Sequence, residues 1–225
     1  MADPLGTCRI TVPVLWDKKL GMIVTNDSWS IINMLSRAFR LLCRPDAPQL
    51  VPSGLEESME AEQAALYNAV LNGVYKVGIN RLKSNHEAAA AAASVLYAAL
   101  EGIEEKLASR RFLLGTPHPT AIDIRLTMTM LRFDIAYRQG FGLRGGRGGV
   151  LVGEGPSSSE AGYSNIGAYV RDVYTYIGGT FTAEDWNAYL QYYRWATGLP
   201  ADQPLPDVAR VYAAVKAPHE RARLP

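Results

Sequence analysis

Three residues near the N-terminus, Pro13, Asp27 and Ser28, have the types and the spacing of a peptide-binding site. Pro13 lies at the start of a short apolar stretch that predicts a strand, and proline, which has no N–H, is restricted to strand edges, strand starts and bulges. A cis bond before Pro13 would turn the N–H and C=O of Val12 out of the sheet, where an extended peptide can pair with them. Asp27 and Ser28 lie where a helix begins, and a helix N-terminus favours a carboxylate. A small peptide with a free carboxylate would contact both features.

Glutathione fits this description, with its cysteinyl backbone on Val12 and its γ-glutamyl carboxylate at Ser28. The same residues also have an interpretation that needs no ligand. Asp27 and Ser28 are common capping residues, and the bond before Pro13 can be trans at the start of a strand. The local pattern leaves both interpretations open.

The elements around these residues predict a small segment of mixed α and β structure. Residues 12–16 indicate a short buried strand, residues 22–24 its hairpin partner, and a helix follows. A strand that opens on a proline, then a hairpin, then a helix is the order of the second half of a thioredoxin-like domain. We therefore expect residues 1–45 to form part of such a domain and residues 46–54, which contain prolines, to be a linker.

Residues 55–225 show apolar residues at helical spacing and almost no strand pattern. Thr120 and Asp123 have the spacing of a capping box. Residues 138–164 are rich in glycine and serine and predict a disordered loop, and residues 216–225 are expected to fray. The fold class predicted is an α+β remnant followed by an all-α domain. The expected helices cover residues 55–79, 86–108, 120–133, 165–177, 182–196 and 207–216.

Composition limits the compartment and the partners. The net charge is +1 over 225 residues, so no surplus of basic charge indicates nucleic acid or a membrane. The short glycine-arginine steps within residues 138–164 do not change this. The sequence lacks an apolar run long enough to cross a bilayer, and its N-terminus lacks the apolar core of a signal peptide. Two cysteines, Cys8 and Cys43, make no disulfide framework. We expect a cytoplasmic protein without a metal.

Five segments of the chain have the residue patterns of one family. They are TVPVLWDKKLGMIVTNDSWSIINML (11–35), LYNAVLNGVYKVGIN (66–80), FLLGTPHPTAIDIRLTMTMLRFDIAY (112–137), YSNIGAYVRDVY (163–174) and YLQYYR (189–194). In this order they resemble the Xi-class glutathione transferases, also called glutathionyl-hydroquinone reductases. The Leu-Trp-Asp-Lys and Asn-Gly-Val-Tyr-Lys runs are more specific to this family than to glutathione transferases in general.

The resemblance implies a fold and an activity. The implied fold is the C-terminal half of a thioredoxin-like domain followed by a helical glutathione-transferase domain, over residues 55–225. Family members reduce glutathione conjugates of quinones: a cysteine thiolate attacks the glutathione sulfur, and a second glutathione then releases the enzyme. The implied co-substrate is glutathione, the implied substrate is a glutathionyl-hydroquinone-like aromatic compound, and the family also suggests a homodimer.

The resemblance also implies roles for individual residues. Tyr75 is implied as proton donor or acceptor. Tyr137 and Tyr192, with Tyr193 as the alternative to Tyr192, are implied to stabilise the thiolate by hydrogen bonding. The chain has 12 tyrosines, and a tyrosine on a helix is often only a core residue, so this interpretation stays open as well. The residues implied to contact glutathione are Arg9, Ile10, Thr11, Val12, Pro13, Asp27 and Ser28.

One feature of the family is missing from the sequence, namely a Cys-Pro pair that opens a helix. Cys8 lies just before the glutathione-pairing strand, and Cys43 lies after the first predicted helix, so we predict neither as the nucleophile. Two explanations stay open. The sequence begins at an internal methionine of a longer protein, or the chain is a non-catalytic transferase-like scaffold or binding module that has lost thiol chemistry. In both cases we expect residues 1–225 alone to be inactive.

Overall fold

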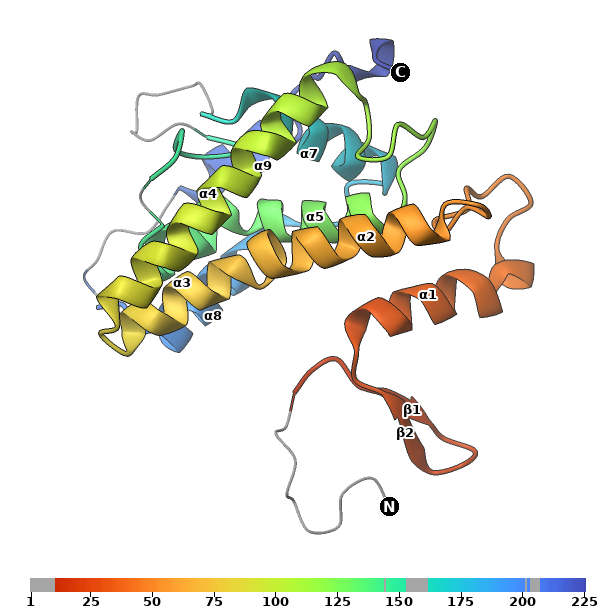
Figure 1. Cartoon of the computed structure of the whole chain (residues 1–225), viewed down its shortest axis with the longest axis horizontal. Coiled ribbons are helices and arrows are strands. Elements are labelled where there is room, and N and C mark those ends of the chain that lie inside the picture. The colour runs from red at the N-terminus through yellow and green to blue at the C-terminus, as the bar shows by residue number, and fades with distance from the viewer. Residues whose placement is uncertain (1–10, 144, 153–161, 201, 203–206) are drawn as a thin grey trace. The chain divides into compact units, whose positions relative to one another are not determined.

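The structure is a computed structural model that describes residues 11–143, 145–152, 162–200, 202 and 207–225. Contacts within the chain divide it into two compact units, Met1–Glu56 and Glu57–Pro225. The first unit contains a small sheet and a helix, and the second unit is helical (Figure 1). This order confirms the predicted fold class, an α+β remnant followed by an all-α domain.

The first unit is a hairpin followed by a helix. Its two strands are antiparallel, and Trp16 on the first pairs with Ile23 on the second. The carboxylate of Asp17 accepts the N–H groups of Lys19 and Leu20 (2.8 and 2.9 Å) and so holds the hairpin turn. The elements are β1 (Leu15–Asp17), β2 (Met22–Thr25), α1 (Ser28–Ala38) and the 3₁₀ turn η1 (Arg40–Leu42).

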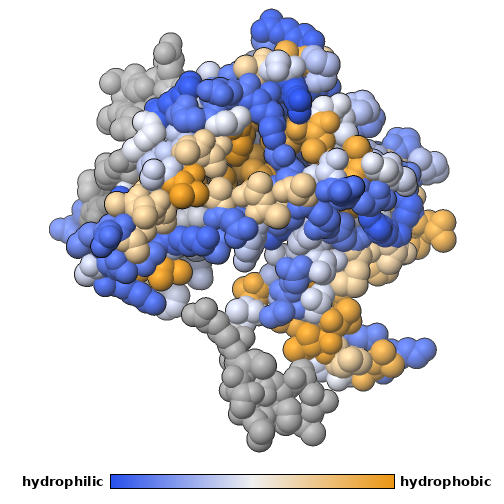
Figure 2. Space-filling model, viewed as in Figure 1, coloured by the Kyte–Doolittle hydropathy of each residue, from blue (hydrophilic) through white to orange (hydrophobic). Residues whose placement is uncertain are grey.

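The first unit exposes much of its apolar surface. The prediction of a buried first strand is wrong, because Val12 is 90% exposed and Trp16 is 48% exposed. A two-stranded sheet is too small to bury its own apolar side chains, so these side chains are exposed to solvent on both faces. Figure 2 shows apolar surface gathered over the hairpin and α1. The other large apolar side chains exposed in this unit are Val14, Leu20, Met22, Ile23, Val24, Leu35, Phe39, Leu41 and Leu42.

The second unit is built from helices that pack around a common core. α3 packs on α4, α4 and α5 pack on α7, and α8 packs on η3 and α9. In Figure 1, α2 and α3 follow one another nearly end to end, and the long α4 returns beside α3. The elements are α2 (Glu56–Leu66), η2 (Tyr67–Leu71), α3 (Gly73–Leu82), α4 (His86–Ser109), α5 (Ala121–Leu131), η3 (Phe133–Tyr137), α6 (Arg138–Gly140), α7 (Ser164–Tyr176), α8 (Ala183–Thr197), α9 (Val208–Val215) and η4 (Arg221–Arg223).

The predicted capping box at the start of α5 is confirmed. The Asp123 carboxylate accepts the N–H and hydroxyl of Thr120 (2.7 and 2.8 Å), the N–H of Leu113 (3.0 Å) and the hydroxyl of Tyr169 (2.9 Å). Asp123 is fully buried, and burial raises the pKa of its carboxyl group against the effect of these donors. One short side chain therefore joins the start of α5 to the preceding loop and to α7.

Part of the glycine-rich segment has a defined structure. We expected a disordered loop over 138–164, but residues 138–140 form α6, and a buried carboxylate holds the backbone of residues 150–152; residues 144 and 153–161 lie outside the described residues. Asp134 on η3 accepts the N–H groups of Val150, Leu151 and Val152 (2.9, 2.6 and 3.2 Å). Val150 and Leu151 are themselves buried. Three donors on one carboxylate and two buried side chains therefore fix this part of the segment.

The C-terminal residues are held in a similar way, and the expectation that residues 216–225 fray is wrong. Arg221 is 3% exposed and donates to the carbonyls of Leu107 (2.9 Å), Arg111 (3.0 Å) and Arg110. These carbonyls lie at the end of α4, where a helix leaves its last carbonyls without partners of its own. The guanidinium group supplies those partners and ties the C-terminus to α4.

The contacts of Asp134 predict a loss of stability when its charge is removed. Asp134→Asn should lower the free energy of unfolding by about 1–3 kcal/mol, because the amide NH₂ cannot accept a backbone N–H and leaves a buried donor without a partner. Urea unfolding followed by circular dichroism measures this. Glu105→Gln on the exposed face of α4 is the matched control, with an expected change within about 0.5 kcal/mol. Equal losses in the two variants would show that the Asp134 contacts do not stabilise the loop.

Candidate functional site

Three tyrosine hydroxyls meet in the core of the second unit. Tyr75 comes from α3, Tyr137 from η3 and Tyr193 from α8. The Tyr75 hydroxyl oxygen lies 3.0 Å from that of Tyr137 and 2.8 Å from that of Tyr193, and the third pair lies 3.4 Å apart. We call Tyr75, Tyr137 and Tyr193 the tyrosine cluster. Its members are up to 118 residues apart in sequence, so only the folded helices bring them together.

Packing around Phe141 sets the positions of the three rings. The Phe141 ring stacks on Tyr137 (5.7 Å between ring centroids) and contacts the edges of Tyr75 (5.6 Å) and Tyr193 (6.1 Å). Gly78, one turn after Tyr75 on α3, makes room for this ring, because a Cβ at position 78 would lie 2.2 Å from it. Close approach of Phe141 to the backbone of α3 therefore requires glycine there.

The backbone of η3 contributes to the same arrangement. Residues Phe133–Tyr137 form a π-helical turn directly after α5, and this turn ends on Tyr137. A π-helical turn changes the direction in which the following side chains leave the helix axis, and such turns are frequent at functional sites. The cluster residue Tyr137 thus lies at a local irregularity of the backbone.

Two of the three cluster tyrosines are buried. Tyr137 is fully buried and Tyr193 is 7% exposed, whereas Tyr75 is only part-buried. Burial raises the pKa of Tyr137 and of Tyr193 above the ordinary value for tyrosine. Both hydroxyls are therefore protonated at neutral pH and can act as hydrogen-bond donors. Tyr75 is the member of the cluster nearest to solvent.

The structure does not place Tyr192 in the cluster. Its side chain is 58% exposed and its ring packs on the rings of Tyr193 (5.3 Å) and Trp195 (6.1 Å). Neighbouring residues on a helix point about 100° apart, so only one of the two tyrosines can face Tyr75. The residue that does so is Tyr193, which the sequence offered as the alternative.

The predicted glutathione-contacting residues lie in the first unit, and Arg9 and Ile10 fall outside the described residues. The bond between Val12 and Pro13 is cis. Thr11, Val12 and Pro13 are exposed, and the hydroxyl of Thr11 accepts a hydrogen bond from the Asn26 side chain (2.9 Å). Val12 lies before the paired part of β1, which begins at Leu15.

The start of α1 matches the capping interpretation of Asp27. Its carboxylate accepts the N–H and the hydroxyl of Ser30 (both 2.7 Å), so Asp27 is the N-cap residue. Ser28 is the first residue of α1 and is part-buried. The helix N-terminus and the exposed Val12 thus lie in the same small unit.

The described residues offer little for thiol or metal chemistry. Cys43 is exposed after η1, and its sulfur lies 3.6 Å from the Phe39 carbonyl oxygen. Cys8 lies outside the described residues. Among the residues that the structure describes, no three His, Cys, Asp or Glu side chains are grouped so that they could hold a metal ion. Within the same ranges, none of the helices has the length and hydropathy needed to cross a bilayer.

Sequence reasoning missed two residues that the structure connects to the tyrosine cluster. Phe141 lies in a glycine-rich segment, and the signal that could have found it is the spacing of Tyr75 and Gly78 on one helix face. Arg132 lies with its guanidinium carbon 5.8 Å from the centroid of the Tyr137 ring. Arg132 directly precedes the Phe-Asp pair in the segment 112–137, and its position in the sequence does not indicate a contact with the Tyr137 ring.

Comparison with known proteins gives a consistent result. Residues 87–172 match the family described as glutathione S-transferase, C-terminal domain. The sequence is 34% identical to the glutathionyl-hydroquinone reductase YqjG of Escherichia coli over 177 residues, which are 79% of this chain and 49% of that protein. The chain thus spans about half the length of the curated relatives that it matches.

Two solved structures resemble most of the chain. The first is the glutathione-bound structure of YqjG, a glutathione transferase homolog from Escherichia coli K-12, with a TM-score of 0.75 and 30% identity over 99% of this chain and 66% of that one. The second is the glutathione-S-transferase Xi from Phanerochaete chrysosporium, with a TM-score of 0.73 and 30% identity over 91% of this chain and 62% of that one.

The geometry of α8 predicts different effects for two adjacent substitutions. Tyr193→Phe should lower the free energy of unfolding by about 1–3 kcal/mol, because the buried Tyr137 hydroxyl and the Tyr75 hydroxyl both lose a partner. Tyr192→Phe removes an exposed hydroxyl and should change the free energy of unfolding by less than about 0.5 kcal/mol. Urea unfolding measures both. If Tyr192→Phe is the more damaging change, the assignment of Tyr193 to the cluster is wrong.

Proposed function

The chain belongs to the Xi-class glutathione transferases, and we propose that it takes part in the glutathione-dependent reduction of glutathionyl-hydroquinone-like aromatic compounds. The observation that best supports this function is the tyrosine cluster, in which two buried, protonated hydroxyls flank a third that is closer to solvent. Such an arrangement suits a proton donor to a carbon that loses its sulfur.

The reaction requires a thiolate and a proton. The thiolate attacks the sulfur of the conjugate, so that an S–S bond forms and the bond from sulfur to the aromatic carbon breaks. The electron pair of the broken bond stays on the carbon, which must then accept a proton. In our proposal Tyr75 gives this proton, since it is the least buried member of the cluster.

The other two tyrosines support Tyr75 in this role. A tyrosine that has lost its proton is stabilised by hydrogen bonds donated to its oxygen. Tyr137 and Tyr193 are 3.0 and 2.8 Å from that oxygen, and burial keeps their own protons in place. We therefore assign to Tyr137 and Tyr193 the stabilisation of the charge on Tyr75, in place of the implied role toward a thiolate.

Glutathione would bind in the first unit. We propose that its cysteinyl backbone pairs with the exposed edge at Val12 and that its γ-glutamyl carboxylate lies at the N-terminus of α1, next to Ser28. Two features support this proposal: Val12 is exposed and precedes the paired residues of β1, and a helix N-terminus favours an anion. Residues Thr11 and Pro13 flank this edge, and Asp27 caps the helix beside it.

The nucleophilic thiolate remains the missing component. Cys43 is exposed and is the C-cap residue of η1, so it lies at the C-terminal end of that turn and does not open a helix. We propose that the nucleophile is a cysteine outside residues 1–225. The transcript upstream of the Met1 codon tests this: an in-frame Cys-Pro pair supports the reductase. A stop codon directly upstream rejects it in favour of a non-catalytic module.

The proposed glutathione site predicts a specific effect of Ser28. Ser28→Ala should weaken glutathione binding by about three- to tenfold, because a hydroxyl at the helix N-terminus is lost. Ser36→Ala is the matched control on the same helix, since the Ser36 hydroxyl donates to the carbonyl of Ile32 (2.7 Å) far from the N-terminus. Isothermal titration calorimetry measures both. Cysteinylglycine, which lacks the γ-glutamyl carboxylate, should bind more weakly than glutathione; equal binding of the two would exclude this site.

The proposed proton donor predicts a separation of catalysis from binding. In the form of the protein that carries the Cys-Pro segment, Tyr75→Phe should lower kcat for glutathionyl-hydroquinone reduction by about 100-fold, because the proton source is removed. The Kd for glutathione should stay unchanged. Tyr192→Phe is the control and should leave both quantities at their original values. A parallel loss of binding and turnover in Tyr75→Phe would mean that Tyr75 is structural.

A further inference from the structure

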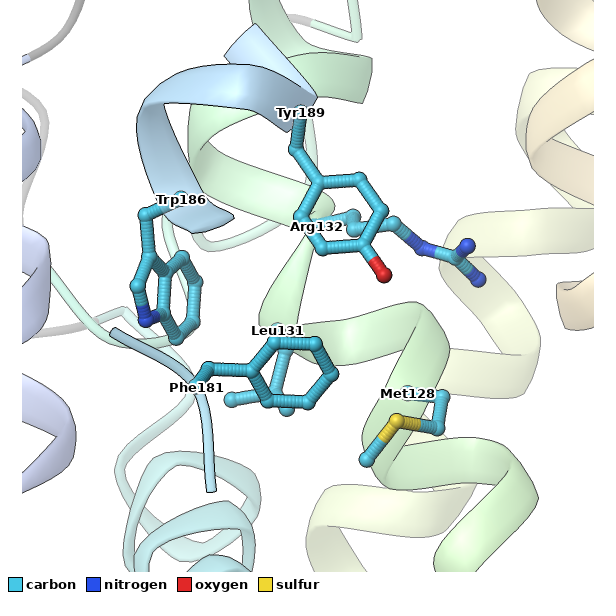
Figure 3. A pocket seen from close by; sticks show the side chains of 6 residues that line it. All are labelled: Met128, Leu131, Arg132, Phe181, Trp186 and Tyr189. Carbon is cyan, nitrogen blue, oxygen red and sulfur yellow. The ribbon is translucent and has the colours of Figure 1, made fainter. Parts of the chain in front are cut away.

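A separate pocket lies within the second unit, beside the tyrosine cluster. Its volume is about 160 Å³, and Figure 3 shows the side chains that line it. Some of these side chains belong to α5 and its C-cap residue, and the others belong to α8 and to the residue before its N-cap. The lining residues are Met128, Leu131, Arg132, Phe181, Trp186 and Tyr189.

Arg132 is the charged residue of this pocket, and its contacts are unusual. Its guanidinium carbon lies 5.8 Å from the ring centroids of both Tyr137 and Tyr189, so the group lies between the cluster and the pocket. Its Nε is buried without a hydrogen-bond partner. Among the residues that the structure describes, none forms an ion pair or a hydrogen bond with the Arg132 side chain. Aromatic faces offset only part of the cost of burying a cation.

Two other arginines of this unit, Arg111 and Arg221, make hydrogen bonds through their guanidinium groups. Arg111 donates twice to the Asp172 carboxylate (2.8 and 2.9 Å), and Arg221 donates to three backbone carbonyls. A buried Nε without a hydrogen-bond partner is not peculiar to Arg132, since Arg171 and Arg221 each have one as well. Arg132 differs from these two in that its side chain lines the pocket, so an anion that enters the pocket would meet its guanidinium group.

The walls of the pocket suit an aromatic ring. The Phe181 ring lies 5.9 Å from Tyr189 and 6.2 Å from Trp186, between ring centroids. Figure 3 shows the Met128 thioether across from these rings, with the Tyr189 hydroxyl and the Arg132 guanidinium on the same side of the pocket. A cavity of about 150 Å³ is large enough for benzene, so the pocket can take a single ring.

We propose that this pocket binds a small single-ring aromatic carboxylate, with its ring among Phe181, Tyr189 and Met128 and its carboxylate on Arg132. A guanidinium group matches the planar geometry of a carboxylate and can bind it through two N–H donors. A phenol of the same size is uncharged at neutral pH and would leave Arg132 without a counter-ion. An inorganic anion would not use the aromatic walls. This ligand is neither glutathione nor its conjugate, so the inference goes beyond the function proposed above.

Calorimetric titration of the whole chain with benzoate and with benzamide tests the proposal. Benzamide has the same shape without the charge, so benzoate should bind at least about tenfold more tightly. Arg132→Met should weaken benzoate binding by about tenfold or more, and Arg132→Lys should keep part of it. Arg110→Met, which removes an exposed arginine from the same unit, should leave it unchanged. Thermal unfolding of each variant shows whether it is folded.

Photolabelling locates the site without any substitution. 4-Azidobenzoate should label peptides that contain residues 128–132 or 181–189, and excess benzoate should suppress that labelling. Neither measurement involves glutathione, so its outcome is independent of the proposed reductase activity. Equal affinities for benzoate and benzamide, unchanged binding in Arg132→Met, or labelling outside these two segments would each overturn the proposal.

Discussion

The hydroxyl of Tyr137 is buried where water cannot reach it, so protein groups must provide its hydrogen bonds. In this fold the partners are other tyrosine hydroxyls, which carry no charge. Tyr75 and Tyr193 supply them from α3 and α8, and the three helical segments must therefore keep a fixed register relative to one another. The same constraint sets the chemistry, because a hydroxyl held between two protonated donors is suited to giving up its own proton.

Buried carboxylates impose the same requirement on the loops. Asp123 gathers donors from the loop before α5, from its own cap and from α7, and Asp134 gathers three consecutive amides of the glycine-rich segment. Each carboxylate is costly to bury unless every donor is in place. Ordering of these loops is therefore coupled to the helices that carry the two aspartates. Phe141, which packs on all three cluster tyrosines, lies in the same glycine-rich segment as these three amides.

The parts of the structure that could be predicted from the sequence are those set by local spacing. The capping box at Thr120 depends on residues only three positions apart, and the helices of the second unit follow from apolar periodicity. The apolar residues of β1 are typical of a buried strand, and its exposure follows instead from the small number of strands that flank it. The choice between Tyr192 and Tyr193 depends on the rotation of α8 about its axis, which two adjacent aromatic residues leave undecided. The structure of residues 150–152 depends on Asp134, a residue outside the glycine-rich segment.

Arg132 connects the two proposed sites through its charge. Burial raises the pKa of Tyr137, and the positive charge of the Arg132 guanidinium group lowers it, because a nearby cation favours an ionised tyrosine. The same positive charge would stabilise the negative charge left on the tyrosine cluster when Tyr75 gives up its proton. A carboxylate bound on Arg132 would offset that positive charge and leave burial as the dominant influence on the hydroxyls. Under both proposals, a carboxylate in the pocket and proton donation by the cluster therefore oppose each other. The reason is that both depend on the positive charge of Arg132, and a carboxylate bound to it would reduce the stabilisation that this charge gives to a deprotonated tyrosine.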